Sequence, residues 1–161
     1  VQHAGQAIDP FVGAKRGAGC GPGEQPLWRT DVLAQLAYQP VILAAAGIAP
    51  SRPEAEDARR GYFDEAALPT TSPALVAWVD AFWVEKGDRL TFRLLGPDLR
   101  AAVERAIVLE KDYPRWFGFA GGRRPGERWP AGTYRAEVTL ERTATDGGAV
   151  RAAIAREIEL R

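Results

Sequence analysis

The chain has 161 residues, a formal net charge of zero and 46% hydrophobic residues, which is enough for one domain with its own core. A neutral chain offers no electrostatic case for nucleic-acid binding, for which a basic stripe is typical, so we expect no nucleic-acid partner. The longest apolar run, Val41 to Ala49, is about half as long as a membrane-spanning helix, so we expect no transmembrane segment.

Residues 1–12 are typical of a short β-hairpin. Two short strands flank a tight turn at Ala4 and Gly5, and the dipeptide Asp9-Pro10 directs the chain away from the hairpin. The sequence contains no Met and begins with Val, so we expect a longer N-terminal part or a signal peptide to precede it.

Residues 13–39 are predicted to form a linker or surface loop followed by a short helix. The stretch from 13 to 27 holds five Gly and two Pro, a composition that breaks regular structure. Thr30 or Asp31 is expected to cap a short helix that stops before Pro40. Cys20 is the single cysteine, which predicts a disulfide to a missing segment, a free thiol, or a plain small residue in the loop.

Residues 40–161 are dominated by alternating apolar and polar side chains, the pattern of half-buried strands. One or two helical turns capped by Ser51 are expected before the main strands begin at residue 74. The segment at 101–110 suits either a helix or a strand, and the close turns around it favour a strand. The last half of the final segment fits an edge strand, with a helix as the alternative. The strands are expected at 41–48, 74–84, 89–95, 101–110, 115–120, 133–140 and 149–160.

About seven strands with turns at short intervals predict a mainly β fold, an antiparallel sandwich of the immunoglobulin or fibronectin type III kind. In two strands the inward set is clear: Leu90, Phe92 and Leu94 in one, and Tyr134, Ala136, Val138 and Leu140 in the other. The sequence P-A-G-T-Y before the second of these strands predicts a tyrosine corner, in which the Tyr134 hydroxyl bonds to nearby backbone.

The chain offers no catalytic set of its own. A zinc site needs three or four converging ligands, and the only imidazole and thiol here are His3 and Cys20. No G-x-S-x-G motif occurs, and the carboxylates between residues 54 and 65 lie among arginines, as on a solvated surface. We therefore assign no catalytic residue and no metal ligand, and expect no cofactor bound by these residues.

The aromatic residues give the one binding hypothesis that the residues alone support. Most must fill the core, but Trp116 and Phe117 are neighbours on one strand and cannot both face inward. An exposed Trp beside arginines could stack on a sugar or dock a partner protein, while the alternative is that Trp129 packs over its own loop. The candidate partner or glycan contacts are Trp116, Trp129, Arg123, Arg124 and Arg128.

Several motifs resemble one family. The opening V-Q-H-A-G-Q-A-I-D-P-F resembles the end of the catalytic domain of LytM/lysostaphin-type zinc peptidases, where a strand, a Gly turn and a D-P or N-P exit follow an H-x-H motif. The remainder is similar to a C-terminal extension found in a subset of bacterial peptidases of this type. The motifs that carry this similarity are D-P-F-V-G with a following G-C-G, L-W-R, the A-Y-Q-P-V-I-L-A-A-G-like strand, K-G-D-R-L-T-F-R-L-L-G-P-D, R-W-F-G-F-A-G-x-R-R-P and W-P-A-G-T-Y-R-A-E-V-T-L.

The resemblance implies a periplasmic or secreted zinc endopeptidase that acts on peptidoglycan. Its zinc ligands would precede Val1, so residues 1–12 would be the last hairpin of a catalytic domain, 13–39 a linker with a short helix, and 40–161 a β-sandwich with a supporting or substrate-positioning role. The partner would be that zinc catalytic domain or another subunit, with peptidoglycan as the candidate ligand. Two alternatives stay open: a stand-alone binding or structural subunit of an envelope complex, and a carbohydrate-binding module.

Overall fold

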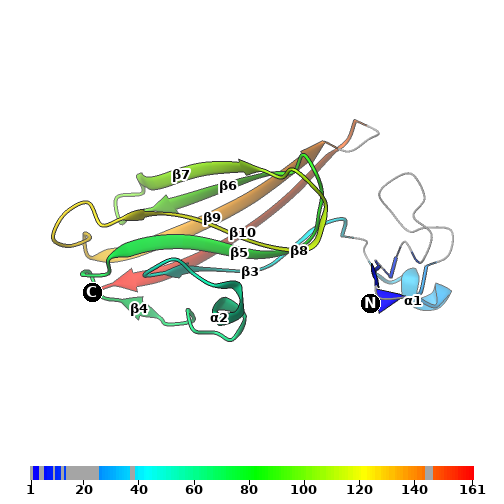
Figure 1. The fold of residues 1–161 in the computed structure, drawn as a ribbon, viewed down its shortest axis with the longest axis horizontal. Coiled ribbons are helices and arrows are strands. Elements are labelled where there is room, and N and C mark those ends of the chain that lie inside the picture. The colour runs from blue at the N-terminus through cyan, green and yellow to red at the C-terminus, as the bar shows by residue number, and fades with distance from the viewer. Residues whose placement is uncertain are drawn as a thin grey trace.

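The computed structural model describes residues 2–3, 6–8, 10–11, 13, 26–36, 39–143 and 147–161, and it is mainly β (Figure 1). No helix in these ranges is long and apolar enough to cross a membrane. The helices are α1 (Thr30–Leu33) and α2 (Ala55–Arg59). The strands are β1 (Gln2–His3), β2 (Gln6–Ala7), β3 (Ile42–Ala49), β4 (Ala67–Leu68), β5 (Ala74–Val84), β6 (Arg89–Leu95), β7 (Ala101–Val108), β8 (Tyr113–Arg123), β9 (Gly132–Thr143) and β10 (Ala149–Leu160).

Two larger sheets face each other and make the body of the molecule (Figure 1). One sheet has the order β3-β5-β8, and the other has the order β4-β10-β9-β6-β7. Neighbouring strands are antiparallel except for β4, which pairs parallel to the end of β10. Apart from the short strand β4, the chain passes from one sheet to the other between β5 and β6, between β7 and β8, and between β8 and β9.

The core lies between the two sheets, and it is formed by the alternate residues that the sequence pattern selects. Leu90, Phe92 and Leu94 of β6 are at most 1% exposed, and the four inward residues predicted for β9 are at most 2% exposed. They pack in one cluster with the inner residues of β5, such as Leu75 and Val79. The predicted inward faces of these two strands are therefore confirmed, because period-2 alternation places every second side chain on the same face.

The N-terminal hairpin lies at one end of the molecule, apart from the two large sheets (Figure 1). β1 and β2 pair antiparallel, with Gln2 opposite Ala7 and His3 opposite Gln6. The predicted turn at Ala4 and Gly5 falls outside the described residues. Helix α1 is shorter than expected, and its N-cap is Arg29, whose side chain makes no capping bond, rather than Thr30 or Asp31.

The structure adds one strand and changes the position of another. The two-residue strand β4 was not predicted, since a strand this short has no period to recognise. Its parallel pairing with Glu159 and Leu160 means that the end of β10 is flanked on both sides rather than lying at a free edge. The N-cap of α2 is Glu54, so the expected cap at Ser51 is wrong.

We expect Gly47→Ala to lower the free energy of unfolding by about 1–3 kcal/mol, because overpacking forces neighbours to shift. A Cβ at Gly47 on β3 would lie 2.6 Å from Cε2 of Trp78, an indole that is itself buried. Gly126→Ala is the matched control, because a Cβ there meets nothing within 4 Å. Urea denaturation measures both, and equal stability of the two variants would contradict the close packing of Trp78 on Gly47.

Candidate functional site

The outer face of the β3-β5-β8 sheet carries an unusual set of side chains. Trp78, Asp80 and Phe82 alternate along β5 on this face, while their neighbours Val79 and Ala81 point into the core. Helix α2 lies over part of the face, and its Ala58 packs with Trp78 in a small second cluster. The sheet therefore has an apolar inner face and an outer face that holds a carboxylate among aromatic rings.

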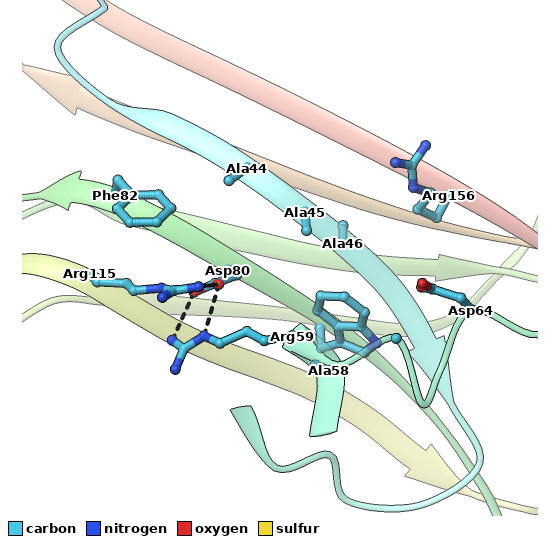
Figure 2. Close-up of a pocket in the computed structure, with 12 residues that line it drawn as sticks. Ala44, Ala45, Ala46, Ala58, Arg59, Asp64, Asp80, Phe82, Arg115 and Arg156 are labelled. Atoms are coloured by element: carbon cyan, nitrogen blue, oxygen red, sulfur yellow. Dashed lines mark hydrogen bonds and ion pairs between the residues drawn. The ribbon is translucent and has the colours of Figure 1, made fainter. Parts of the chain in front are cut away.

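The carboxylate of Asp80 is held by two arginines from different elements. Arg59 at the end of α2 donates from Nε to Oδ2 at 3.0 Å and from Nη2 to Oδ1 at 3.1 Å. Arg115 of β8 donates from Nε to both oxygens at 3.2 Å and also from Nη2. Figure 2 shows the two guanidinium groups converging on the carboxylate. Asp80 is only 4% exposed, so this pairing compensates the cost of burying its charge.

The same two arginines fix the ionisation of Asp80. Burial of the carboxyl favours the neutral acid, but hydrogen bonds and charge from Arg59 and Arg115 outweigh it and hold the pKa of Asp80 below its ordinary value. The hydrogen bond to Asp80 likewise raises the pKa of Arg59. The cluster is therefore a fixed array of two cations around one anion near neutral pH.

This lowered pKa predicts a pH dependence of stability. Ionised Asp80 stabilises the fold fully above its unfolded pKa of about 3.9, and the contribution is lost as the pH falls through the lower folded pKa. Asp80→Asn should therefore be less stable than the wild type at pH 7, with the difference shrinking below about pH 4. Urea denaturation at pH 7 and at several pH values below about 4 measures the stability difference between the two proteins. Glu127→Gln, on an exposed loop, is the control. A difference that stays constant down to about pH 2 would contradict the pairing.

A hollow of about 390 Å³ opens beside this cluster. The volume lies within the range of small-ligand sites, roughly 300–1,000 Å³. Three guanidinium groups and two carboxylates line it, which leaves one net positive charge. The lining residues are Ala44, Ala45, Ala46, Ala58, Arg59, Gly61, Asp64, Trp78, Asp80, Phe82, Arg115 and Arg156.

Several hydrogen-bond donors of this lining have no protein acceptor among the described residues. The Nε1 of Trp78 is buried without a partner, which is uncommon because buried polar groups are usually satisfied. Arg59 and Arg115 use Nε and Nη2 on Asp80, and their Nη1 atoms bond to no other described residue. Arg156, exposed on β10, makes no ion pair or hydrogen bond with the described part of the chain. The arginine donors can therefore hold a group rich in hydrogen-bond acceptors in the hollow, while the Trp78 Nε1 lies covered beside Gly47.

The structure does not bring the predicted aromatic and arginine contacts together as a binding face. Trp129 is 5% exposed, and its Nε1 donates to the Ser72 carbonyl at 2.9 Å, so it packs in the core beside its own loop. Arg124 is tied to backbone, to the Gly126 carbonyl at 2.8 Å and to the Thr71 carbonyl. Trp129 therefore cannot stack on a sugar, and the alternative interpretation, that it packs over its own loop, agrees with the structure.

The remaining members of that set are not joined into a site. Trp116 is half-buried and packs against the core, with its ring lying over Gly118. Arg123 and Arg128 are exposed. An exposed arginine without an aromatic platform or an acceptor beside it is ordinary solvated surface, so we assign no binding role to this pair.

Tyr134 makes the bond that a tyrosine corner requires. Its hydroxyl donates to the Pro130 carbonyl at 3.1 Å, and burial, with a smaller effect from Asp98, raises the pKa of Tyr134. Cys20 lies outside the described residues, so its disulfide stays a prediction. No group of three or more His, Cys, Asp or Glu side chains that could hold a metal occurs within the ranges described above.

The Asp80 cluster was not predicted as a site, although the sequence contains a signal for it. Asp80 is the one charged residue in the eleven-residue apolar strand β5, and a charge in a buried strand needs a partner. The chain was also compared with protein-family models, curated proteins and solved structures, and none of the three comparisons finds a match.

Proposed function

We propose that this chain is the non-catalytic C-terminal region of a secreted or periplasmic zinc peptidase that acts on peptidoglycan, with a supporting or substrate-positioning role. The proposal starts from the resemblance of residues 1–11 and of the later motifs to LytM/lysostaphin-type enzymes. Zinc, the cofactor of the parent enzyme, would be bound by a preceding catalytic domain. No residue of this chain is assigned as a ligand.

The proposed fold of residues 40–161 is an immunoglobulin or fibronectin type III-like sandwich. The order β3-β5-β8 against β10-β9-β6-β7 supports it, because seven strands divided between two sheets with crossover connections are typical of such domains. The bond from Tyr134 at the head of β9 to Pro130 is a second supporting feature. The short parallel strand β4 is an addition to this arrangement.

The observation that carries a binding role is the state of Asp80. A general acid or base needs a pKa near the working pH and a free oxygen that can reach the substrate. Asp80 instead has a lowered pKa, and both of its oxygens accept hydrogen bonds from arginine. The hollow beside it offers unused donors, so its chemistry suits holding a ligand and favours substrate positioning over bracing alone.

The gene that encodes this chain tests the assignment to the peptidase. We expect the codons directly upstream of Val1 to encode an H-x-H motif, and their absence would contradict the proposal and favour a stand-alone subunit. Protein that includes this upstream region should release soluble fragments from purified peptidoglycan in the presence of zinc and lose that activity with a chelator. Residues 1–161 alone should release none, and release by this chain would also count against a non-catalytic role.

A further inference from the structure

We infer that the hollow on the outer face of the β3-β5-β8 sheet is a carboxylate-binding site, and that its ligand is the free carboxylate of a short peptide. That the ligand is a carboxylate follows from the geometry of the hollow. Only the source of the peptide, the stem peptide of peptidoglycan, rests on the proposed function.

Asp80 orients the two arginines that would hold the carboxylate. Because Arg59 and Arg115 each place Nε and Nη2 on Asp80, their planes are fixed, and each keeps an Nη1 donor that no described residue accepts. Arginine is suited to carboxylates because its N–H groups form a rigid planar fork. Preorganised donors of this kind bind without the entropy cost of ordering a free side chain.

The charge of the lining favours a monoanion. Arg59, Arg115 and Arg156 face Asp64 and Asp80 in one hollow, so the net charge is one positive unit. A carboxylate neutralises this charge, whereas a phosphate dianion would bring a second negative charge close to two carboxylates. Carboxylate and phosphate both accept hydrogen bonds from arginine, so their affinities for the hollow have to be compared directly.

The apolar part of the lining fits a small residue next to the carboxylate. The ring of Phe82 lies 4.9 Å from the Arg115 guanidinium carbon, and the alanines of β3 leave the adjoining wall shallow. In Figure 2 Asp64 and Arg156 lie away from Phe82 and Arg115, so a peptide can extend toward them from its carboxylate. The unpaired Nε1 of Trp78 in the same lining makes this indole a sensitive reporter of an occupant.

Side-chain NMR of the whole chain tests the inference, with N-acetylalanine as the carboxylate probe. The indole N–H of Trp78, assigned with Trp78→Phe, and the Nε–H groups of Arg59 and Arg115 should shift saturably, with Kd on the order of 1 mM. The neutral N-acetylalaninamide should cause no saturable shift, and inorganic phosphate should bind at least about threefold more weakly. Equal shifts with the acid and the amide, or tighter binding of phosphate, would overturn the carboxylate site.

Two variants locate the probe in the hollow. Arg115→Lys keeps a cation beside Asp80 but loses the free Nη1, so it should raise Kd about tenfold. Arg156→Gln removes an exposed guanidinium that takes no part in the Asp80 pairing, and it should raise Kd about threefold while leaving thermal stability unchanged. Arg105→Lys on the exposed strand β7 is the control and should bind like the wild type.

Unchanged affinity in both pocket variants would contradict the inference. Binding to peptidoglycan without binding of N-acetylalanine would overturn the carboxylate site and leave the proposed function standing. Specific carboxylate binding in a protein whose gene lacks the upstream H-x-H would support the carboxylate site and contradict the proposed assignment to a peptidase.

Discussion

Asp88→Ala is expected to lower the free energy of unfolding by about 3–5 kcal/mol, because it breaks a buried ion pair, even though Glu85 lies 3.2 Å from Nη1 of Arg142. Asp88 is fully buried, and Arg142 donates to it from Nε at 2.7 Å and from Nη2 at 2.8 Å. Asp88 also accepts from the Glu85 backbone N–H at 2.9 Å, which closes the turn between β5 and β6. One substitution therefore removes a buried ion pair and a side-chain hydrogen bond of the turn.

Urea denaturation followed by circular dichroism measures this loss. Glu104→Ala is the control, since Glu104 lies 3.4 Å from Arg93 on the exposed face of the sheet, and such pairs contribute about 0–1 kcal/mol. A comparable effect of the two substitutions would show that Asp88 and Arg142 are hydrated in solution and would contradict the buried pair.

Trp129→Ala should destabilise the domain by about 3–5 kcal/mol, because it removes a large side chain from the core. The ring is 5% exposed, lies edge-on to Tyr134 with centroids 6.1 Å apart, and donates to the Ser72 carbonyl. Trp129 is one of the residues that tie the loop before β9 to the core, together with Arg124 and the Tyr134 hydroxyl, and we expect its loss to loosen the loop as well.

The matched control is Trp28→Ala, because Trp28 is 39% exposed and should change stability by about 0.5 kcal/mol or less. Trp129→Phe separates packing from hydrogen bonding, and the lost indole donor should cost about 1 kcal/mol. Thermal and urea denaturation compare the three variants. A Trp129→Ala variant as stable as Trp28→Ala would restore Trp129 as a surface binding residue.

The sandwich strands could be predicted because each carries its own signal. Leu90, Phe92 and Leu94 alternate with polar residues, so their inward face follows from the local sequence alone. The segment at 101–110 needed the turns on either side, and the structure confirms a strand there as β7. The mainly β class thus follows from local patterns, while the pairing of β4 with β10 depends on contacts far apart in sequence.

The charged cluster of the candidate site could not be predicted because its residues come from three elements distant in sequence. Asp80 is on β5, and its partners lie 21 residues before it on α2 and 35 residues after it on β8. The sequence shows that Asp80 needs a partner but cannot say which arginine supplies it. The exposed-Trp hypothesis failed at Trp129 for a similar reason, since its burial depends on where the loop before β9 folds back.

The backbone at Trp83 is another feature that the local sequence pattern does not predict. Trp83 has φ of 58°, a left-handed conformation that is rare for a bulky residue. Pairing with β8 keeps its register from Phe82 to Val84, but the core face changes from Val79 and Ala81 to Val84. Its carbonyl accepts a hydrogen bond from Arg142 at 2.9 Å, so the irregularity is held by the buried ion pair of Asp88. Alternation along β5 predicts the faces before this point and not beyond it.

Co-sedimentation with purified peptidoglycan tests the central claim, that this chain binds cell-wall material without cleaving it, most directly. We predict that the wild type and Arg105→Lys pellet with the insoluble peptidoglycan, that Arg115→Lys stays largely in the supernatant, and that no soluble fragments are released. A wild-type chain that stays in the supernatant, or that releases fragments by itself, would contradict the account.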